Sequence, residues 1–132
     1  MNYKLSTDGI EVAVKPEYID SQVVEDGQNI FVWAYHIVIK NKSQNTLQLI
    51  NRYWKIIDEN GLVQEVSGIG AVGEQPILIP NENFKYSSSV HLNQPSGIMS
   101  GYYGMKKSDG EIINVQIPAF SLDVPDAQSV IN

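Results

Sequence analysis

The chain has no cysteine among its 132 residues. It therefore has no disulfide, no thiol nucleophile and no cysteine-based metal site, which is consistent with a reducing compartment. Histidine is nearly as scarce: the two histidines, His36 and His91, lie far apart in the sequence without a close ligand partner. Because a transition-metal site needs clustered imidazole or carboxylate ligands, we expect neither a metal site nor another cofactor.

Long apolar runs and an excess of basic residues are missing as well. No stretch approaches the roughly 20 apolar residues of a membrane-spanning helix, and residues 1–8 lack the apolar region of a secretory signal. Nine basic residues stand against 15 acidic ones, a net charge of -6, and Lys106-Lys107 is the only basic pair in the sequence. Such a chain repels nucleic-acid phosphate. We therefore expect a cytoplasmic protein that binds neither membranes nor nucleic acid.

Alternation of apolar and polar residues is the main pattern that is present. It is strongest in residues 31–39, FVWAYHIVI, where aromatic and β-branched side chains fall on alternate positions. This predicts a strand, and its half-apolar second face favours a central place in a sheet. Residues 10–14 alternate too, and we expect Pro16 to end or bend that strand because proline has no amide donor. Residues 46–58 and 84–92 predict two more long strands, and no window indicates a helix.

Turn residues separate the other predicted strands. Residues 58–61, DENG, predict a hairpin that returns through 62–66, and SDG at 108–110 predicts a second one between 98–107 and 112–117. A short last strand is expected near 120–122. The length fits a single domain over residues 1–132. We predict an all-β fold of about seven or eight strands, an antiparallel β-sandwich of fibronectin-III or immunoglobulin type, with a barrel as the alternative.

The chain contains the blocks QLINRYW at 48–54 and GIGAVGEQP at 68–76, with further blocks at 31–35, 84–88, 97–103 and 117–122. In their residues and in their order along the chain, these blocks resemble the ApaG family. One departure is Asn81, where the family usually has glycine, but asparagine also tolerates the left-handed conformation. The resemblance covers about Gly9 to Pro125. It implies a fibronectin-III-like sandwich, a bacterial protein connected with cobalt and magnesium resistance, and kinship with eukaryotic domains that serve protein contact.

The glycines Gly68, Gly70 and Gly73 have the spacing of a dinucleotide-binding fingerprint. That fingerprint needs a helix whose N-terminal amides hold the pyrophosphate. Here Pro76 follows within three residues and the next segment is β-like. We predict that this glycine loop (residues 68–73) connects strands. Weak binding of an anion, nucleotide or pyrophosphate by its backbone amides is the alternative function.

The cluster Ser87-Ser88-Ser89 with His91 is the one feature suggestive of a nucleophilic triad. Alternation places Ser87, Ser89 and His91 on one strand face. Residues two apart in a strand are separated by about 7 Å, beyond hydrogen-bond reach for these short side chains. We therefore predict that the protein is not an enzyme.

Arg52 and Trp54 are the residues that we expect to anchor a partner. Arg52 shares a strand face with Trp54 and Ile56, where a guanidinium must find a carboxylate, carbonyl or aromatic partner. It either fixes a loop carbonyl or carboxylate, or stands at the rim of a binding cleft beside the glycine loop, because arginine and tryptophan are common energetic centres of interfaces. The predicted function is a non-catalytic module, monomeric or weakly homodimeric, that binds an unidentified protein partner.

Overall fold

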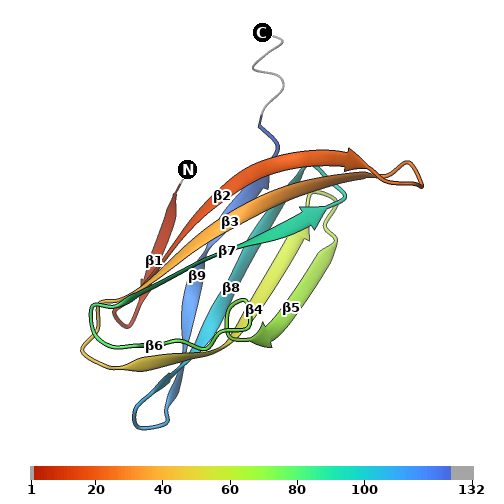
Figure 1. Cartoon of the computed structure of the whole chain (residues 1–132). Coiled ribbons are helices and arrows are strands. Elements are labelled where there is room, and N and C mark those ends of the chain that lie inside the picture. Colours follow the sequence, from red (N-terminus) through yellow and green to blue (C-terminus); the bar gives the residue numbers. More distant parts are fainter. Residues whose placement is uncertain (1, 126–132) are drawn as a thin grey trace.

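The computed structural model describes residues 2–125, which form nine strands in two antiparallel sheets (Figure 1). Sheet A has the order β1-β2-β3-β7, and sheet B has the order β5-β4-β8-β9, with β6 paired to β4. The strands are β1 (Tyr3–Thr7), β2 (Ile10–Val23), β3 (Asn29–Asn41), β4 (Leu47–Asp58), β5 (Val63–Ile69), β6 (Ile77–Leu78), β7 (Asn83–Leu92), β8 (Ser96–Lys107) and β9 (Ile112–Asp123). The predicted antiparallel β-sandwich is confirmed.

Helix is absent from residues 2–125. Accordingly, the described part of the chain has no helix with the length and apolar character needed to cross a membrane. The backbone instead reverses direction at tight turns, several of which contain residues with positive φ. Asn81 is one of them, with φ of 74°. The expectation that asparagine takes the left-handed conformation here is confirmed.

The core lies between the two sheets and is built from alternate residues of each strand. In β3 the odd-numbered residues Trp33, Tyr35, Ile37 and Ile39 are buried, as the period of two predicts. An aromatic cluster joins the sheets: the ring centroid of Trp54 lies 5.3 Å from that of Tyr35 and 6.0 Å from that of Phe120. Burying side chains of this size stabilises the fold by about 1.5–3 kcal/mol each.

The N-terminal strands differ from the prediction in two respects. The short strand β1 was not predicted, and β2 does not end at Pro16 but continues to Val23, with Pro16 paired opposite Tyr35. The reason is that β1 pairs with β2 only over Ile10–Val14. At Pro16 one side of β2 has no neighbouring strand, so a missing amide there need not interrupt the sheet.

The strands of sheet B contain irregularities that a simple period of two does not predict. In β4 the register against β8 shifts between Leu49 and Asn51. The buried positions therefore change from Leu47 and Leu49 before the shift to Trp54 and Ile56 after it. The two segments expected at 112–117 and 120–122 are one strand, β9, and its register against β8 shifts between Met99 and Gly101.

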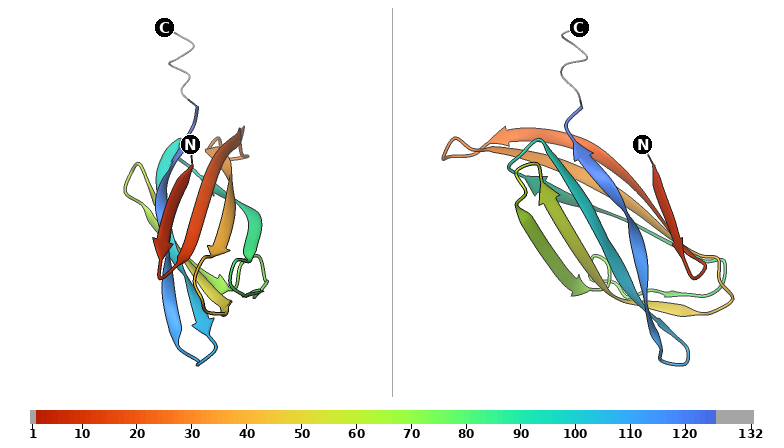
Figure 2. Two further views of the ribbon diagram at one scale, coloured as in Figure 1. Left: turned by 90° about the vertical axis from the view of Figure 1, so that its left-hand side faces the viewer. Right: turned by 180° about the vertical axis from the view of Figure 1, so that it is seen from behind.

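The two long sides of the sandwich are built differently. On the side that we call the closed side, β9 packs against β1 and β2. The Trp33 indole Nε1 donates to the Asp123 carbonyl at 2.9 Å, and the Gln116 amide donates to Thr7 Oγ1 at 3.1 Å. The other side, the open side, is bounded by the edge strands β5 and β7. Figure 2 also shows the β2–β3 hairpin extending beyond sheet B.

Candidate binding cleft

A cleft of ≈ 280 Å³ lies between the sheets on the open side. The buried side chains of Tyr35, Trp54 and Met99 are part of its lining. Strands β5 and β7 line it from the two sheets, and Val72 of the glycine loop lines it as well. Its other lining residues are Arg52, Ile56, Gln64, Val66, Tyr86, Ser88, Ser89, Val90 and His91.

The sequence of β7 explains why the cleft exists. Large side chains of this strand, Phe84 and Tyr86, pack against the core, and so does Val90. The position between Tyr86 and Val90 on the same face is Ser88, which pairs opposite Tyr35 in the register. Because serine is much smaller than its neighbours, the inner face of β7 leaves space above Tyr35 and Trp54.

The indole nitrogen of Trp54 has no hydrogen-bond partner, although the side chain is only 2% exposed. Within residues 2–125, Nε1 of Trp54 and Oε1 of Glu11 are the two buried side-chain polar atoms without a partner. An unpaired buried donor costs about 1–3 kcal/mol of stability. A buried polar group that is left unpaired beside a cleft is a candidate contact for a ligand acceptor.

Arg52 holds the glycine loop against β4. Its Nη1 donates to the carbonyl oxygens of Ile69 and Gly70, both at 3.1 Å. The guanidinium covers Gly68 so closely that a Cβ there would lie 2.7 Å from Nη1. The structure thus shows the loop-carbonyl contact expected for Arg52 and also places it in the cleft wall. Its role as a partner anchor stays a prediction, as does that of Trp54.

The glycine loop contains a tight hairpin. Val72 and Gly73 both have positive φ, 45° and 80°, as the two central residues of a type I′ turn require. The amides of Ala71 and Glu74 donate to each other's carbonyl at 2.9 Å, and the Gly70 amide donates to the Ile50 carbonyl at 2.8 Å. These three amides are already paired. Anion binding at Gly68, Gly70 and Gly73 stays a prediction that this geometry does not strengthen.

Val72 stands out in this hairpin because a β-branched residue rarely adopts positive φ. Its side chain is 52% exposed and lines the cleft. Residues in such conformations cost about 1–3 kcal/mol and gather at binding sites. The backbone of Val72 is therefore strained, and its apolar side chain lies at the cleft.

Below the cleft, one side-chain contact joins the two sheets. The hydroxyls of Tyr86 in β7 and Tyr103 in β8 are hydrogen-bonded to each other. Burial raises the pKa of Tyr86 and of Tyr103 well above the ordinary tyrosine value. Both hydroxyls are therefore neutral over the physiological range, and they form a polar contact inside an apolar core.

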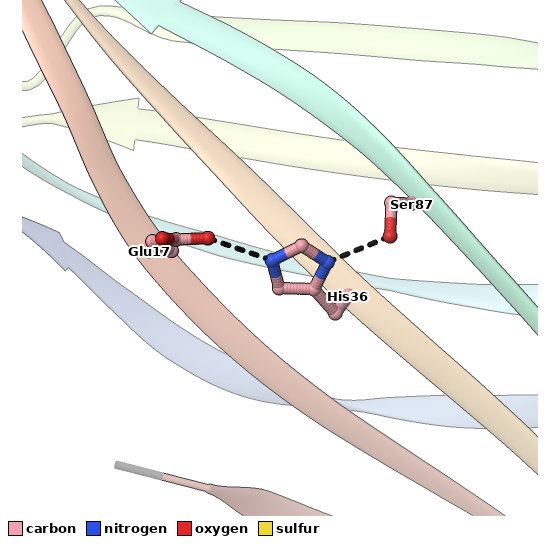
Figure 3. A network of polar contacts seen from close by, with 3 residues as sticks. All are labelled: Glu17, His36 and Ser87. Carbon is pink, nitrogen blue, oxygen red and sulfur yellow. Dashed lines mark hydrogen bonds and ion pairs between the residues drawn. The ribbon is translucent and has the colours of Figure 1, made fainter.

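The outer face of sheet A carries a polar network that sequence reasoning missed. His36 contacts Ser87 Oγ through Nδ1 at 2.6 Å and Glu17 Oε1 through Nε2 at 2.9 Å (Figure 3). The sequence pattern groups the serines with His91. In the structure, however, His91 lines the cleft, and the register places Ser87 directly opposite His36. The pairing of β3 with β7 is the signal that would have revealed the network.

Lysines also gather on this sheet although the sequence shows no such cluster. Lys42 donates to Glu11 Oε2 at 3.0 Å, and this hydrogen bond, together with the nearby charges of Lys4 and Lys40, lowers the pKa of the Glu11 carboxyl. Lys40 and Lys42 lie two residues apart in the sequence, whereas Lys4 comes from β1. The fold brings Lys4 to the other two.

These features define a class of protein: an antiparallel β-sandwich with a partly apolar cleft between the edge strands β5 and β7. No group of three or more possible metal ligands occurs in the part of the chain that the structure describes. The family model of the ApaG domain matches residues 21–107. The chain belongs to the ApaG family.

Known relatives agree with this assignment along the whole chain. The protein ApaG of Allorhizobium ampelinum is 51% identical over 130 residues, covering 98% of this chain and 99% of the relative. The protein ApaG of Sinorhizobium fredii is 49% identical with the same coverage. A crystal structure described as that of an ApaA protein from Bordetella pertussis is 38% identical, covers 89% of this chain and 95% of its own, and has a TM-score of 0.81.

Proposed function

We propose that the chain is a binding module that takes an extended segment of a partner protein along β5 and into the cleft. The observation that carries the proposal is the exposure of β5. This edge strand leaves Val63 48%, Val66 43% and Ile69 68% exposed. An edge strand of this length, with three exposed apolar side chains among polar ones, is a template for pairing with another strand, because its outer backbone groups have no partner in the sheet.

The cleft beside β5 supports the proposal because it can provide specificity. Backbone pairing along an edge gives affinity for many sequences, whereas side-chain pockets select among them. Val66 lies where the edge strand meets the cleft, since it belongs to β5 and also lines the cleft. A partner side chain that enters the cleft meets the apolar surface of Trp54 and Met99.

The charge of the cleft favours one kind of segment. Arg52 and His91 line it, and its described lining contains no carboxylate, although the whole chain has a net charge of -6. An apolar segment that carries an acidic residue is therefore the best match in charge. We propose that any role in cobalt and magnesium resistance is exercised in the cytoplasm through such a partner, without catalysis.

A library of displayed peptides tests the proposal without knowledge of the natural partner. We expect selected peptides to be apolar and acidic, and to shift the backbone amide signals of β5 and of the cleft residues in NMR spectra. Val66→Lys should weaken their binding at least tenfold, about 1.4 kcal/mol. The matched control is Ile98→Lys, which changes an exposed isoleucine outside the cleft and should leave binding unchanged.

Two results would contradict this function. One is equal weakening by both lysine variants, which would mean that general surface charge is responsible. The other is a set of shifted amides away from β5 and the cleft. Sedimentation over a range of concentrations separates partner binding from pairing of β5 between two copies, which is the weak homodimer that the sequence left open.

A further inference from the structure

We propose that Ser87 is an activated hydroxyl that accepts an acyl group from an activated, negatively charged acyl donor. Ser87 lies on the outer face of sheet A, opposite His36 and Glu17 (Figure 3). The cleft lies on the inner side of the same sheet. The proposal is thus independent of partner binding.

Hydrogen-bond chemistry assigns the protons of the network in the form in which His36 is neutral. An ionised carboxylate only accepts hydrogen bonds, so the His36 Nε2 that contacts Glu17 at 2.9 Å must carry the proton and donate it. In the neutral ring, Nδ1 then has a free lone pair. In this neutral form, the serine hydroxyl donates the bond of 2.6 Å between Ser87 Oγ and Nδ1. Ser87 therefore has a base in place for its proton, and Glu17 stabilises the imidazolium that forms.

The sheet holds the three residues in this arrangement. They come from three adjacent strands: Glu17 from β2, His36 from β3 and Ser87 from β7. The site is open to donors, since the side chains of His36 and Glu17 are 41% and 56% exposed. Because β7 is the edge of sheet A, alternate backbone amides near Ser87 point away from β3 and can donate to a developing oxyanion.

The charge around the network selects anionic donors. Lys15 lies opposite His36 in the register of β2 and β3. Lys4 and Lys15 line a shallow hollow together with His36, and Lys85 precedes Ser87 by two residues in β7. The carboxylate of Glu17, and that of Glu11 near Lys4, offset part of the positive charge of these three lysines. A donor with a carboxylate or phosphate group is therefore attracted to this face.

The reaction is a transfer without oxidation or reduction. Ser87 Oγ attacks the carbonyl carbon of the donor while its proton passes to His36 Nδ1. The bond between the carbonyl carbon and the leaving group then breaks, and the leaving group departs with the electron pair and takes up the proton. The products are a Ser87 ester and the free leaving group, so the chain is modified once and no turnover is required.

Ser89 provides an internal control, because it is exposed on the same strand and no hydrogen bond from its side chain to His36 is present. The probes are 4-nitrophenyl acetate and its anionic counterpart, 4-nitrophenyl hydrogen succinate. We expect one hydroxylamine-sensitive ester per chain, located on Ser87 by peptide mass spectrometry. It should form about 100-fold faster than any ester on Ser89, the low end of general-base catalysis, and the anionic probe should react faster than acetate.

Variants of the three network residues test their roles, and Ser89→Ala is the control. Ser87→Ala should remove the ester and Ser89→Ala should not. Glu17→Gln should slow acylation about as much as His36→Gln, because a glutamine amide can donate to Nε2 and so place the ring proton on Nδ1. Acylation of Ser87 and Ser89 at equal rates would overturn the proposal. So would unchanged acylation in His36→Gln or in Glu17→Gln when circular dichroism shows both variants folded.

Discussion

The two tryptophans of the chain show how the closed and open sides differ. Trp33 is buried on the closed side, and its indole donates to the Asp123 carbonyl at 2.9 Å. Trp54 is equally buried beside the open cleft, but its indole donates to no partner. The indole N–H donor is thus hydrogen-bonded on the side where the sheets pack together and unpaired on the side where they separate. The unpaired donor at Trp54 therefore lowers the stability of the open side.

The hydrogen bonds that join the two sheets also differ between the closed and the open side. On the closed side, side chains bond to the backbone of β9 and the backbone of β9 bonds to Thr7 of β1. On the open side, the hydroxyls of Tyr86 and Tyr103 form the hydrogen bond between the sheets. In addition, Arg52 donates to backbone carbonyls of the glycine loop and so holds this loop in place. The open side therefore depends on a few polar groups. Each can be removed by a single substitution.

The largest effect is expected from Gly70→Val, which breaks the open side at its loop. Gly70 has a φ of 62°, and a Cβ there would lie 2.0 Å from the Glu74 carbonyl oxygen. Clash and backbone strain together should reduce the free energy of unfolding by about 4 kcal/mol, measured by urea denaturation.

The matched control is Gly73→Ala in the same hairpin. Gly73 also has positive φ, but no atom lies within 4 Å of a Cβ at that position. The loss should then be about 1–2 kcal/mol, from backbone strain alone. Equal losses in the two variants would show that the contact with Glu74 does not matter.

Replacing each tryptophan by phenylalanine sharpens the comparison between the sides. Trp33→Phe removes core volume and also leaves the Asp123 carbonyl unpaired, so we expect a loss of about 3 kcal/mol. Trp54→Phe removes similar volume but also deletes an unsatisfied donor, and its loss should be smaller by about 1–2 kcal/mol. Thermal and urea unfolding measure both. Equal losses would mean that the Trp54 indole has a partner in solution.

High pH should weaken the open side through the tyrosine pair. Burial raises the pKa of Tyr86 and Tyr103 in the folded state, whereas unfolded tyrosine ionises near a pKa of about 10. The stability that the neutral pair contributes is therefore complete below about pH 10 and is lost as pH rises further. The free energy of unfolding should fall by about 1.4 kcal/mol per pH unit for each tyrosine.

A phenylalanine double variant identifies the source of this alkaline decline. At pH 7, Tyr86→Phe alone leaves the Tyr103 hydroxyl without its partner and should cost about 1–2 kcal/mol. The double replacement should cost less than the sum of the two single ones. If the alkaline decline is as steep in the double variant as in the parent, other groups cause it.

The smallest effect is expected from nucleotides. The glycine loop has three paired amides and no helix to hold a phosphate, so titration with ATP, GTP or pyrophosphate should give at most millimolar binding. Isothermal titration calorimetry with and without magnesium measures this. Low-micromolar binding that disappears in a folded Gly73→Ala variant would make the glycine loop the functional site in place of the cleft.

Much of the fold could be predicted because its strands alternate clearly. Residues 31–39 gave a central strand, and DENG at 58–61 gave the turn between β4 and β5, where Asp58 Oδ1 accepts the amides of Asn60 and Leu62. The bulge in β4 was not predicted, because its mark is a change of the buried phase between Leu49 and Trp54, and isoleucines on the other face, Ile50 and Ile57, obscure that change in the sequence. Neither was the passage of β2 through Pro16, which depends on the length of its neighbour.

The candidate sites, like the fold, could be predicted from the sequence only in part. Arg52 and Trp54 were singled out because a charge and a large aromatic shared a strand face, and both line the cleft. The network of Glu17, His36 and Ser87 was missed, because its members come from three strands and meet only through the register. The alternation of residues along one strand shows which side chains share a face of that strand. Which side chains of different strands meet depends on how the strands pair, and this pairing is not visible in the alternation.

The bonds of the closed side join residues that are far apart in the chain. Trp33 and Asp123 are separated by 90 residues, and Thr7 and Gln116 by 109. During synthesis, β1, β2 and β3 therefore leave the ribosome long before β9 exists to cover them. Contacts of such long range also make folding slow. The apolar surface of β1 and β2 that β9 covers stays exposed until the end of translation. This is the interval in which chaperones or aggregation compete for the nascent chain.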